Sequence, residues 1–338
     1  MLKTMRCQIL LFVIALPLLP VAARDVASET SSRASVSSRM FINASDRWRG
    51  SDSADDEGLA LELTRFFVNA RVDLDSEWSA HITTDVVWTR NDDPSSPWLR
   101  YAYLQRRLGD AAVLRLGSAP LPWINAESAQ KGYRYVDAGL VSRSGLGTSA
   151  DYGLHMQGGD GWFNYGLSVV TGGGYKRPRL GRRADVEARF GWTPVESVEL
   201  AVGGYRGSLA RKGVDGRHPP LAQRWNVLTT WTGKRAKVGA QYIRAHNWSG
   251  VPCRSHGWSG WSSYQIARTG AVFVRHDHTS PSREPAAPLA ERYSQVGVEW
   301  KASDYLRVAL VGKQMELKSS AHESESNEFG VWGELLFR

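Results

Sequence analysis

The sequence lacks the long apolar runs and the paired cysteines that mark two common classes of membrane and secreted protein. Beyond the N-terminus of this 338-residue chain, no apolar run approaches the length of about 20 residues that a membrane-spanning helix needs. A bundle of membrane helices is therefore excluded. Of the two cysteines, Cys7 lies in the N-terminal segment, so the rest of the chain holds only Cys253 and cannot form an internal disulfide.

The chain also lacks motifs for catalysis, cofactors and nucleic acid. It contains neither a Gly-x-Ser-x-Gly nucleophile motif nor a phosphate-binding loop. His276-Asp277-His278 places two histidines on one face of a strand, but a metal site needs a third ligand in a defined place. The formal net charge is +8, yet the basic residues are scattered rather than clustered. We expect no enzyme activity, no cofactor, no metal and no nucleic-acid partner.

The N-terminus has the three parts of a secretory signal. Lys3 and Arg6 precede a short apolar stretch over 9–19, and Val21-Ala22-Ala23 has the small residues of a cleavage site. We expect a signal peptide over 1–23, with a retained anchor helix as the less favoured alternative. A short flexible lead over 24–34 follows.

The remaining sequence, 35–338, is dominated by alternation with a period of two. Apolar residues on one face of the segment 77–90 include Trp78 and Trp88, which are ten positions apart. At roughly 3.3 Å per residue these two rings are about 33 Å apart along a strand. With a tilt of about 40° this matches an apolar band about 25 Å high between two aromatic girdles, longer than a strand in a soluble sandwich needs.

The spacing of turn residues predicts about sixteen strands joined alternately by tight turns and long polar loops, which is the plan of an outer-membrane barrel. The expected fold is an all-β, transmembrane, antiparallel β-barrel of porin-like architecture over 35–338. The expected strands are 35–43, 60–74, 77–90, 98–108, 111–117, 149–157, 162–171, 183–193, 197–207, 221–232, 236–247, 259–267, 271–279, 291–300, 305–318 and 327–338.

The faces opposite the apolar ones are charged or polar, which predicts a hydrated lumen. The longest connection, 118–148, is the candidate constriction loop, since loops longer than about 15 residues are usually functional or disordered. A plain solvated loop is the alternative. The expected pore-lining and constriction residues are Arg71, Asp73, Asp85, Arg115, Glu127, Lys131, Arg134, Arg143, Glu187 and Arg189.

Several motifs resemble a poorly characterised group of Gram-negative porins. They are Arg115-Leu-Gly-Ser-Ala-Pro-Leu-Pro-Trp123, Lys131-Gly-Tyr-Arg-Tyr135, Ser149-Ala-Asp-Tyr-Gly-Leu154 and the segment 163–175. The resemblance is clearest over about 98–176. It implies a cell outer-membrane location, passive diffusion of small hydrophilic solutes, contact with outer-membrane lipid and lipopolysaccharide, and assembly as a homotrimer.

The C-terminus resembles the last strand that the barrel-assembly machinery recognises, with alternating apolar residues up to Phe337. It departs from that pattern by ending in Arg338 rather than in an aromatic residue. The predicted function is an outer-membrane porin with a weak preference for anions, because a cationic constriction concentrates them. The alternatives are a substrate-specific channel for phosphate or oligosaccharide, and a barrel that acts as an adhesin or structural anchor.

Overall fold

The computed structural model describes residues 33–49, 57–89, 97–179, 183–211, 220–248, 253–280, 290–318 and 323–337. The expected signal peptide and all but the end of the lead lie outside the described residues. Within these ranges the chain forms sixteen strands: β1 Arg33–Arg49, β2 Gly58–Asp73, β3 Trp78–Trp88, β4 Trp98–Leu108, β5 Ala112–Pro120, β6 Ala150–Gly159, β7 Phe163–Val170, β8 Asp185–Val195, β9 Val198–Gly207, β10 Ala222–Thr232, β11 Ala236–His246, β12 Arg254–Gln265, β13 Gly270–Ser280, β14 Ala290–Lys301, β15 Leu306–Lys318 and β16 Glu323–Phe337.

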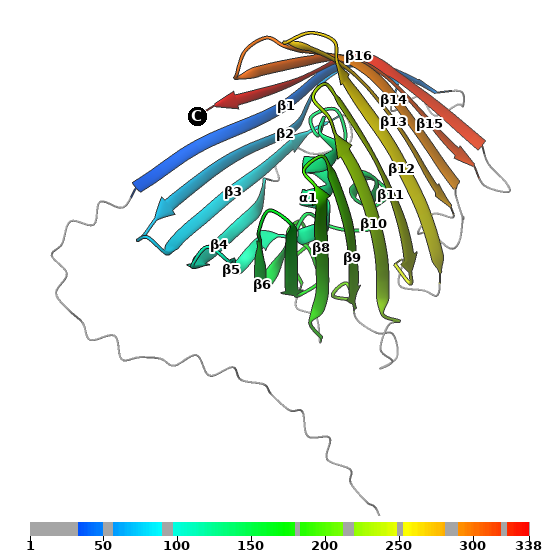
Figure 1. Cartoon of the computed structure of the whole chain (residues 1–338). Helices are drawn as coiled ribbons and strands as arrows, with labels where there is room; N and C mark the ends of the chain where they lie inside the picture. The colour runs from blue at the N-terminus through cyan, green and yellow to red at the C-terminus, as the bar shows by residue number, and fades with distance from the viewer. Residues whose placement is uncertain are drawn as a thin grey trace, which may run out of the picture. The chain divides into compact units, whose positions relative to one another are not determined.

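The strands form one closed barrel in which each strand pairs with its neighbours in the sequence (Figure 1). All pairs are antiparallel, and β1 closes the barrel by pairing with β16, with Ser38 opposite Phe337 and Arg49 opposite Ser326. The prediction of a closed antiparallel barrel with sixteen strands is therefore confirmed.

Two of the short turns at one end of the barrel are stabilised by an acidic side chain that bonds to the backbone that follows it. Asp75 Oδ1 accepts hydrogen bonds from the backbone N–H groups of Glu77 and Trp78, both at 2.7 Å. Asp160 does the same for Trp162 and Phe163. These are the local contacts that favour Asp in tight turns. The opposite end of the barrel, which carries the longer connections, is called the long-loop end below.

Apolar side chains cover the outside of the barrel, as the alternation predicts. Strand β3 begins at Trp78 and ends at Trp88, with both rings on the outer face. Such a continuous apolar exterior suits lipid rather than water. Outward-facing residues with at least half of their surface exposed include Val36, Leu59, Leu61, Ile82, Leu116, Val202, Trp225, Val227 and Val296.

Some boundaries differ from those expected. Pro194 and Val195 were expected in a turn, but they belong to β8, where a bulge lies between Trp192 and Val195. A bulge tolerates proline because the local ladder of hydrogen bonds is already interrupted. Strands β1, β12 and β16 begin earlier or end later than expected, because their polar ends lack the apolar alternation that marks the middle of the wall.

Candidate functional site

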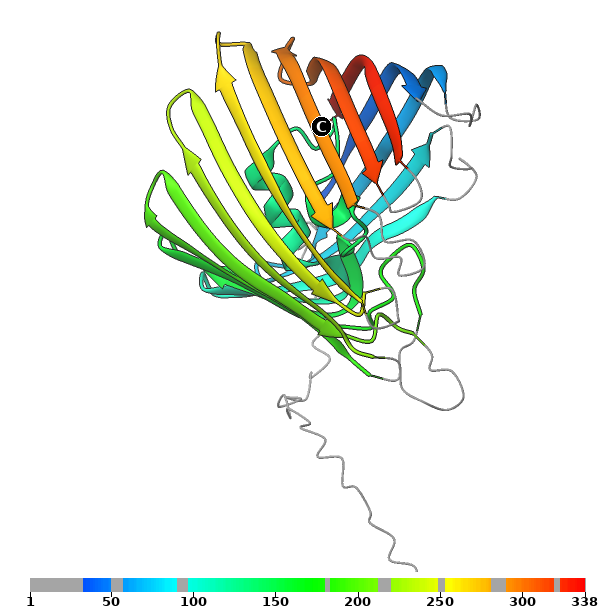
Figure 2. The same cartoon turned by 90° about the vertical axis from the view of Figure 1, so that its right-hand side faces the viewer.

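The connection between β5 and β6, residues 121–149 and called the inner loop below, folds into the barrel (Figures 1 and 2). It contains helix α1, Pro122–Lys131, and the short helix α2, Leu140–Arg143. Pro122 occupies the first helical turn, where its missing N–H costs nothing, and Gly132 ends the helix with a φ of 72°. Neither of these two helices in the described part of the chain is long and apolar enough to cross a membrane.

On one side, α1 packs against β7, β8 and β9. The Trp123 ring, 1% exposed, fills the space above Gly203, where a Cβ atom would lie 2.5 Å from the ring. Ile124, Leu140 and Val141 join it in an apolar cluster with Ile243 and other wall residues. A side chain at position 203 would push Trp123 away, so this glycine provides the socket for the helix.

A buried ion pair fixes the same side of the loop. Glu187 Oε1 accepts a hydrogen bond from the Trp123 backbone N–H at 3.0 Å, and its Oε2 accepts one from Arg224 Nη2 at 2.7 Å. Arg224 Nη1 also donates to the carbonyl of Leu146 at 2.6 Å. Both charged side chains are 1% exposed or less. Glu187 therefore joins the start of the loop, and through Arg224 its end, to the wall.

Glu127 and Lys131, two residues expected at the constriction, are buried between the loop and the wall. Gln241 Nε2 donates to Glu127 Oε1 at 2.7 Å, and Lys131 Nζ donates to the carbonyl of Asp137 at 2.8 Å. Burial raises the pKa of the Glu127 carboxyl and lowers the pKa of the Lys131 amine. Both residues therefore lie away from the open part of the lumen described below.

On the far side, the loop is held by charged and polar groups of β13 to β15. Arg143 pairs with Asp277 at 3.0 Å and with Glu291. Tyr293 donates to Asp137 Oδ2 at 2.6 Å. Burial alone would raise the pKa of Asp137, but Lys313, Arg275 and Arg143 together with the Tyr293 hydroxyl lower it below its usual range.

Aromatic rings complete this attachment. Tyr133 stacks on Phe273 with ring centroids 4.0 Å apart, and Tyr135 lies in one apolar cluster with Phe41 and Trp332. Tyr135 also donates to Glu299 Oε2 at 2.7 Å. The inner loop thus crosses the lumen and contacts the wall from β7 round to β1.

Open space remains on the third side, between the inner loop and a part of the wall formed by β1 to β4 together with β15 and β16. One cavity of about 340 Å³ lies toward the long-loop end, and its lining includes Arg47, Glu62, Arg65 and Glu328. A second cavity of about 480 Å³ lies toward the short turns, and its lining includes Arg39, Arg100 and Tyr101. Phe41 and Arg134 line both cavities, so the two spaces meet at these side chains.

Arginines dominate this meeting point. Among the described residues, no carboxylate lies within ion-pairing distance of Arg134 or Arg100. Arg100 instead lies over the rings of Phe67 and Tyr101, at 4.8 and 4.9 Å. Arg65 pairs with the buried Asp85 at 2.7 Å. Burial, and then Arg65 and Arg100, lower the pKa of Arg134 to about 10, so its guanidinium stays charged at neutral pH.

Arg65 and Arg100 both lie at β-bulges. The β2–β3 register shifts between Leu63 and Phe66, and the β3–β4 register shifts between Thr83 and Thr84. A bulge re-aims side chains by adding an unpaired residue to a strand. A rule of strict alternation therefore does not predict that Arg100 faces the lumen, and nothing in the sequence around 98–101 indicates the bulge.

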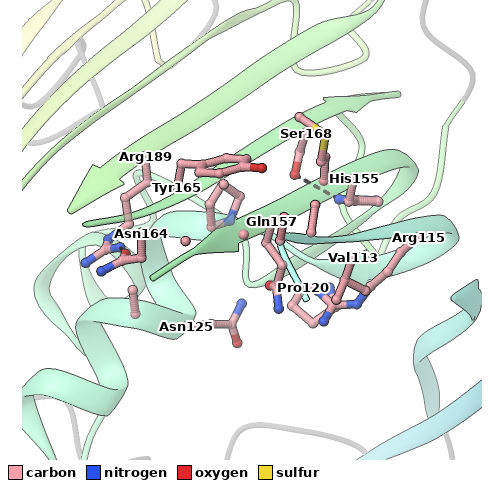
Figure 3. A pocket seen from close by; sticks show the side chains of 18 of the residues that line it. Val113, Arg115, Pro120, Asn125, His155, Gln157, Asn164, Tyr165, Ser168 and Arg189 are labelled. Atoms are coloured by element: carbon pink, nitrogen blue, oxygen red, sulfur yellow. Dashed lines mark hydrogen bonds between the residues drawn. The ribbon is translucent and has the colours of Figure 1, made fainter. Parts of the chain in front are cut away.

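A third cavity, about 650 Å³ in volume and called the recess below, lies near the short turns between α1 and strands β5 to β8 (Figure 3). Figure 3 shows Arg189 and Asn164 at one end and Arg115 at the other. Arg115 donates to two neutral amides, to Gln105 at 2.9 Å and to Gln157 at 2.8 Å. Arg189 pairs with Glu199 and bonds to Asn164.

The expected site residues are thus distributed over several places. Arg134 lies where the two cavities meet, Asp85 supports Arg65 beside it, and Arg115 and Arg189 line the recess. Arg71 and Asp73 pair with each other at 2.7 Å near the short turns. The remaining four, Glu127, Lys131, Arg143 and Glu187, attach the inner loop to the wall.

His276 and His278, considered as metal ligands, face outward, whereas Asp277 faces the lumen and pairs with Arg275 and Arg143. The described residues contain no group of three or more His, Cys, Asp or Glu side chains placed to hold a metal ion.

No protein-family model matches the chain, and no curated protein sequence does. Solved structures match it closely in fold. The outer membrane channel DcaP of Acinetobacter baumannii matches with a TM-score of 0.68 at 10% identity, over 92% of this chain and 99% of that chain. OmpF of Salmonella typhi, in complex with daunomycin, matches with a TM-score of 0.66 at 10% identity, over 90% and 98%.

An anion-selective porin from Comamonas acidovorans matches with a TM-score of 0.62 at 11% identity, over 90% of this chain and 100% of that chain. At these identities the likeness is one of fold. The chain therefore has the sixteen-strand barrel architecture found in outer-membrane porins and channels.

Proposed function

We propose that the chain is an outer-membrane porin through which small hydrophilic solutes diffuse, with a preference for anions. The observation that carries the proposal is the pair of cavities that meet at Arg134, between the inner loop and the wall formed by β1 to β4, β15 and β16. The apolar exterior and the fold shared with outer-membrane channels support the membrane location.

The charge along this route favours anions. The cavity toward the short turns is lined by Arg39, Arg100 and Arg134 and by no carboxylate among the described residues. In the other cavity the acidic residues have partners, since Glu328 pairs with Arg47 at 3.2 Å and Asp137 accepts from Tyr293. An anion passing about 6 Å from one guanidinium gains about 0.7 kcal/mol at the permittivity of water, a factor of about three.

The test is a planar bilayer with purified protein under a salt gradient. We expect steady conductance and a reversal potential of the sign that anion preference gives. Replacing Arg134 and Arg100 by Gln should lower the anion-to-cation permeability ratio at least tenfold, since each change removes a factor of about three in the attraction of anions and also the repulsion of cations. The matched control is Lys234→Gln/Arg235→Gln, which removes two positive charges from an exposed turn that lines none of the three cavities.

Two results would count against the proposal. If correctly folded protein gave no conductance, the proposed channel function would be wrong. An unchanged permeability ratio in the Arg134→Gln/Arg100→Gln variant, or an equal change in the control, would show that these arginines do not cause the preference for anions.

The recess favours a second candidate, a substrate-specific channel. Arg115 lies beside the Gln157 amide at one end of the recess, and the amides of Asn125 and Asn164 also line the recess. This combination of one guanidinium and several amides is suited to a phosphate or to the hydroxyl groups of an oligosaccharide. Concentration-dependent block of the current by inorganic phosphate or a malto-oligosaccharide, lost in Arg115→Gln, would support it. Purely additive conductance without saturation would not.

Assembly as a homotrimer and insertion by the barrel-assembly machinery complete the proposal. The fold shared with solved outer-membrane porins and the terminal strand β16, which closes the barrel against β1, are what support these two points. Cross-linking in detergent followed by mass determination tests the first. A single mass equal to one chain would contradict it.

A further inference from the structure

Aromatic side chains of β1 to β4 form a continuous row on the open side of the lumen, called the aromatic track below. From the meeting point of the two cavities toward the short turns, the row consists of Phe41 on β1, Phe67 on β2, Tyr101 and Tyr103 on β4, and His81 on β3. The first three line the cavity of about 480 Å³, and the last two continue the row beyond it.

Contacts between successive side chains make the upper part of the row continuous. Phe41 and Phe67 meet edge to face, with ring centroids 5.9 Å apart. The Arg100 guanidinium joins Phe67 to the next ring, because its central carbon lies 4.8 Å from the Phe67 centroid and 4.9 Å from the Tyr101 centroid. The centroids of Tyr101 and Tyr103 are 6.2 Å apart. These distances are typical of aromatic pairs and of cations on rings.

The lower end of the track lies nearer the short turns. Tyr103 is directly opposite His81 in the register and stacks on it, with ring centroids 4.7 Å apart. Arg115 lies over the other neighbour of this stack, since its guanidinium carbon is 5.5 Å from the Tyr103 centroid. Tyr101, Tyr103 and His81 are only half-buried, so part of their ring surface is accessible from the lumen.

The bulge in β4 brings positive charge to the track. Regular alternation would send one of two consecutive residues outward, but the shift between Thr83 and Thr84 lets Arg100 and Tyr101 both face the lumen. Arg100 and Arg134 line the same cavity, and among the described residues neither pairs with a carboxylate. A guanidinium lying over a ring keeps its N–H groups in its own plane, where they donate in pairs to a carboxylate.

We propose that the aromatic track binds small aromatic carboxylates, with the ring of the solute against the track and its carboxylate on Arg100 or Arg134. The inference rests on the anion-preferring channel proposed above and names the class of solute that this channel favours. The cavity of about 480 Å³ is within the range of about 300–1,000 Å³ for sites that hold small molecules. An aliphatic carboxylate uses the guanidinium groups without the rings, and a neutral sugar uses the rings without the charge. Only an aromatic anion uses both.

The test measures the concentration of benzoate that halves the chloride current through the purified full-length protein in a planar bilayer. Cyclohexanecarboxylate carries the same charge on a ring without aromatic electrons, so its half-blocking concentration should be about fivefold higher, the contribution expected of ring stacking.

The variant Tyr101→Leu/Tyr103→Leu keeps apolar side chains but removes two rings, and it should raise the half-blocking concentration of benzoate by about fivefold. Tyr101→Phe/Tyr103→Phe keeps the rings and should leave it nearly unchanged. The matched control is Tyr165→Leu, which removes a ring from the recess and leaves the aromatic track intact. It should behave as the wild type does.

Equal half-blocking concentrations of benzoate and cyclohexanecarboxylate on the wild type would overturn the inference, and this comparison needs no variant to fold. An equal shift in Tyr101→Leu/Tyr103→Leu and in Tyr165→Leu, or a block by maltose as strong as that by benzoate, would overturn it too. Heat-dependent mobility on a detergent gel verifies that each variant is folded. The preference for chloride over potassium should be unchanged in Tyr101→Leu/Tyr103→Leu, because the arginines remain. A failure of benzoate binding is therefore distinguishable from a failure of the channel proposal, which would abolish conductance or anion preference in the wild type.

Discussion

Replacing Glu187 by Gln should loosen the inner loop without changing the shape of its attachment. The side chain keeps its size and one carbonyl acceptor, but the carboxylate that neutralises Arg224 is lost. Arg224 is 1% exposed and would remain charged beside a neutral amide. Removing one partner of a buried ion pair costs about 3–5 kcal/mol. Because Arg224 keeps its hydrogen bond to the Leu146 carbonyl, we take the lower end, about 3 kcal/mol.

That cost acts on the equilibrium between the seated loop and a displaced loop. At about 1.4 kcal/mol per factor of ten, it raises the displaced population by about 150-fold. Trypsin reports this population, since Lys131 is buried in the seated loop and cleavage after it needs displacement. When opening is fast relative to cleavage, the rate follows the equilibrium population. The measurement is the appearance of the fragment that ends at Lys131, by mass spectrometry.

The matched control is Glu316→Gln, which removes a carboxylate from an exposed pair with Arg292 on the outside of the barrel. Exposed pairs contribute little to stability, so its cleavage rate after Lys131 should equal that of the wild type. A rate for Glu187→Gln within threefold of this control would refute the view that the Glu187–Arg224 pair holds the loop.

Two further predictions concern the socket and the far attachment of the loop. Gly203→Val should displace Trp123 and cost about 1–3 kcal/mol through overpacking, which should lower the unfolding temperature seen as a mobility change on a detergent gel. Gly260→Val, where a Cβ meets open space, should leave that temperature unchanged. Equal losses in the two variants would show that Gly203 is not a socket for Trp123. Folding lowers the pKa of Asp137, so its contribution to stability is complete above its unfolded pKa of about 3.9 and is lost as the pH falls through the lower folded pKa. Asp137→Asn should therefore unfold at a lower temperature than the wild type at pH 7, and this difference in unfolding temperature should shrink as the pH falls below about 3. A difference that does not depend on pH would show that the charge of Asp137 is not the cause.

The wall of the barrel was predictable because its signal is local. Alternation and turn residues placed β4 at 98–108, and the structure has the same boundaries. The prediction was poorer for β12, which was expected from 259 but begins at Arg254. Arg254 and His256 face outward beyond the apolar band, so the rule that apolar side chains mark the outer face does not hold there.

The inner loop was predictable only in part, because its partners are distant in the sequence. The length of 118–148 indicated a functional loop, but nothing local identifies Gly203 as the socket for Trp123. The sequence also showed which residues of the loop are charged, but not the direction in which each side chain points. Lys131 and Arg134 are three residues apart, yet Gly132 ends the helix between them and Tyr133 follows with a φ of 50°, so the two side chains take different directions.

The attachments of the inner loop have a consequence for the order of assembly. Arg143 contacts residues 134 and 148 positions later in the chain, and Val136 contacts Lys313, 177 positions away. Contacts across such separations form late, because their loop-closure entropy must be overcome first. A barrel that has closed before these contacts form encloses a wide and unobstructed lumen. A strongly held loop therefore keeps the finished barrel from returning to that unobstructed state, in which its membrane would be leaky.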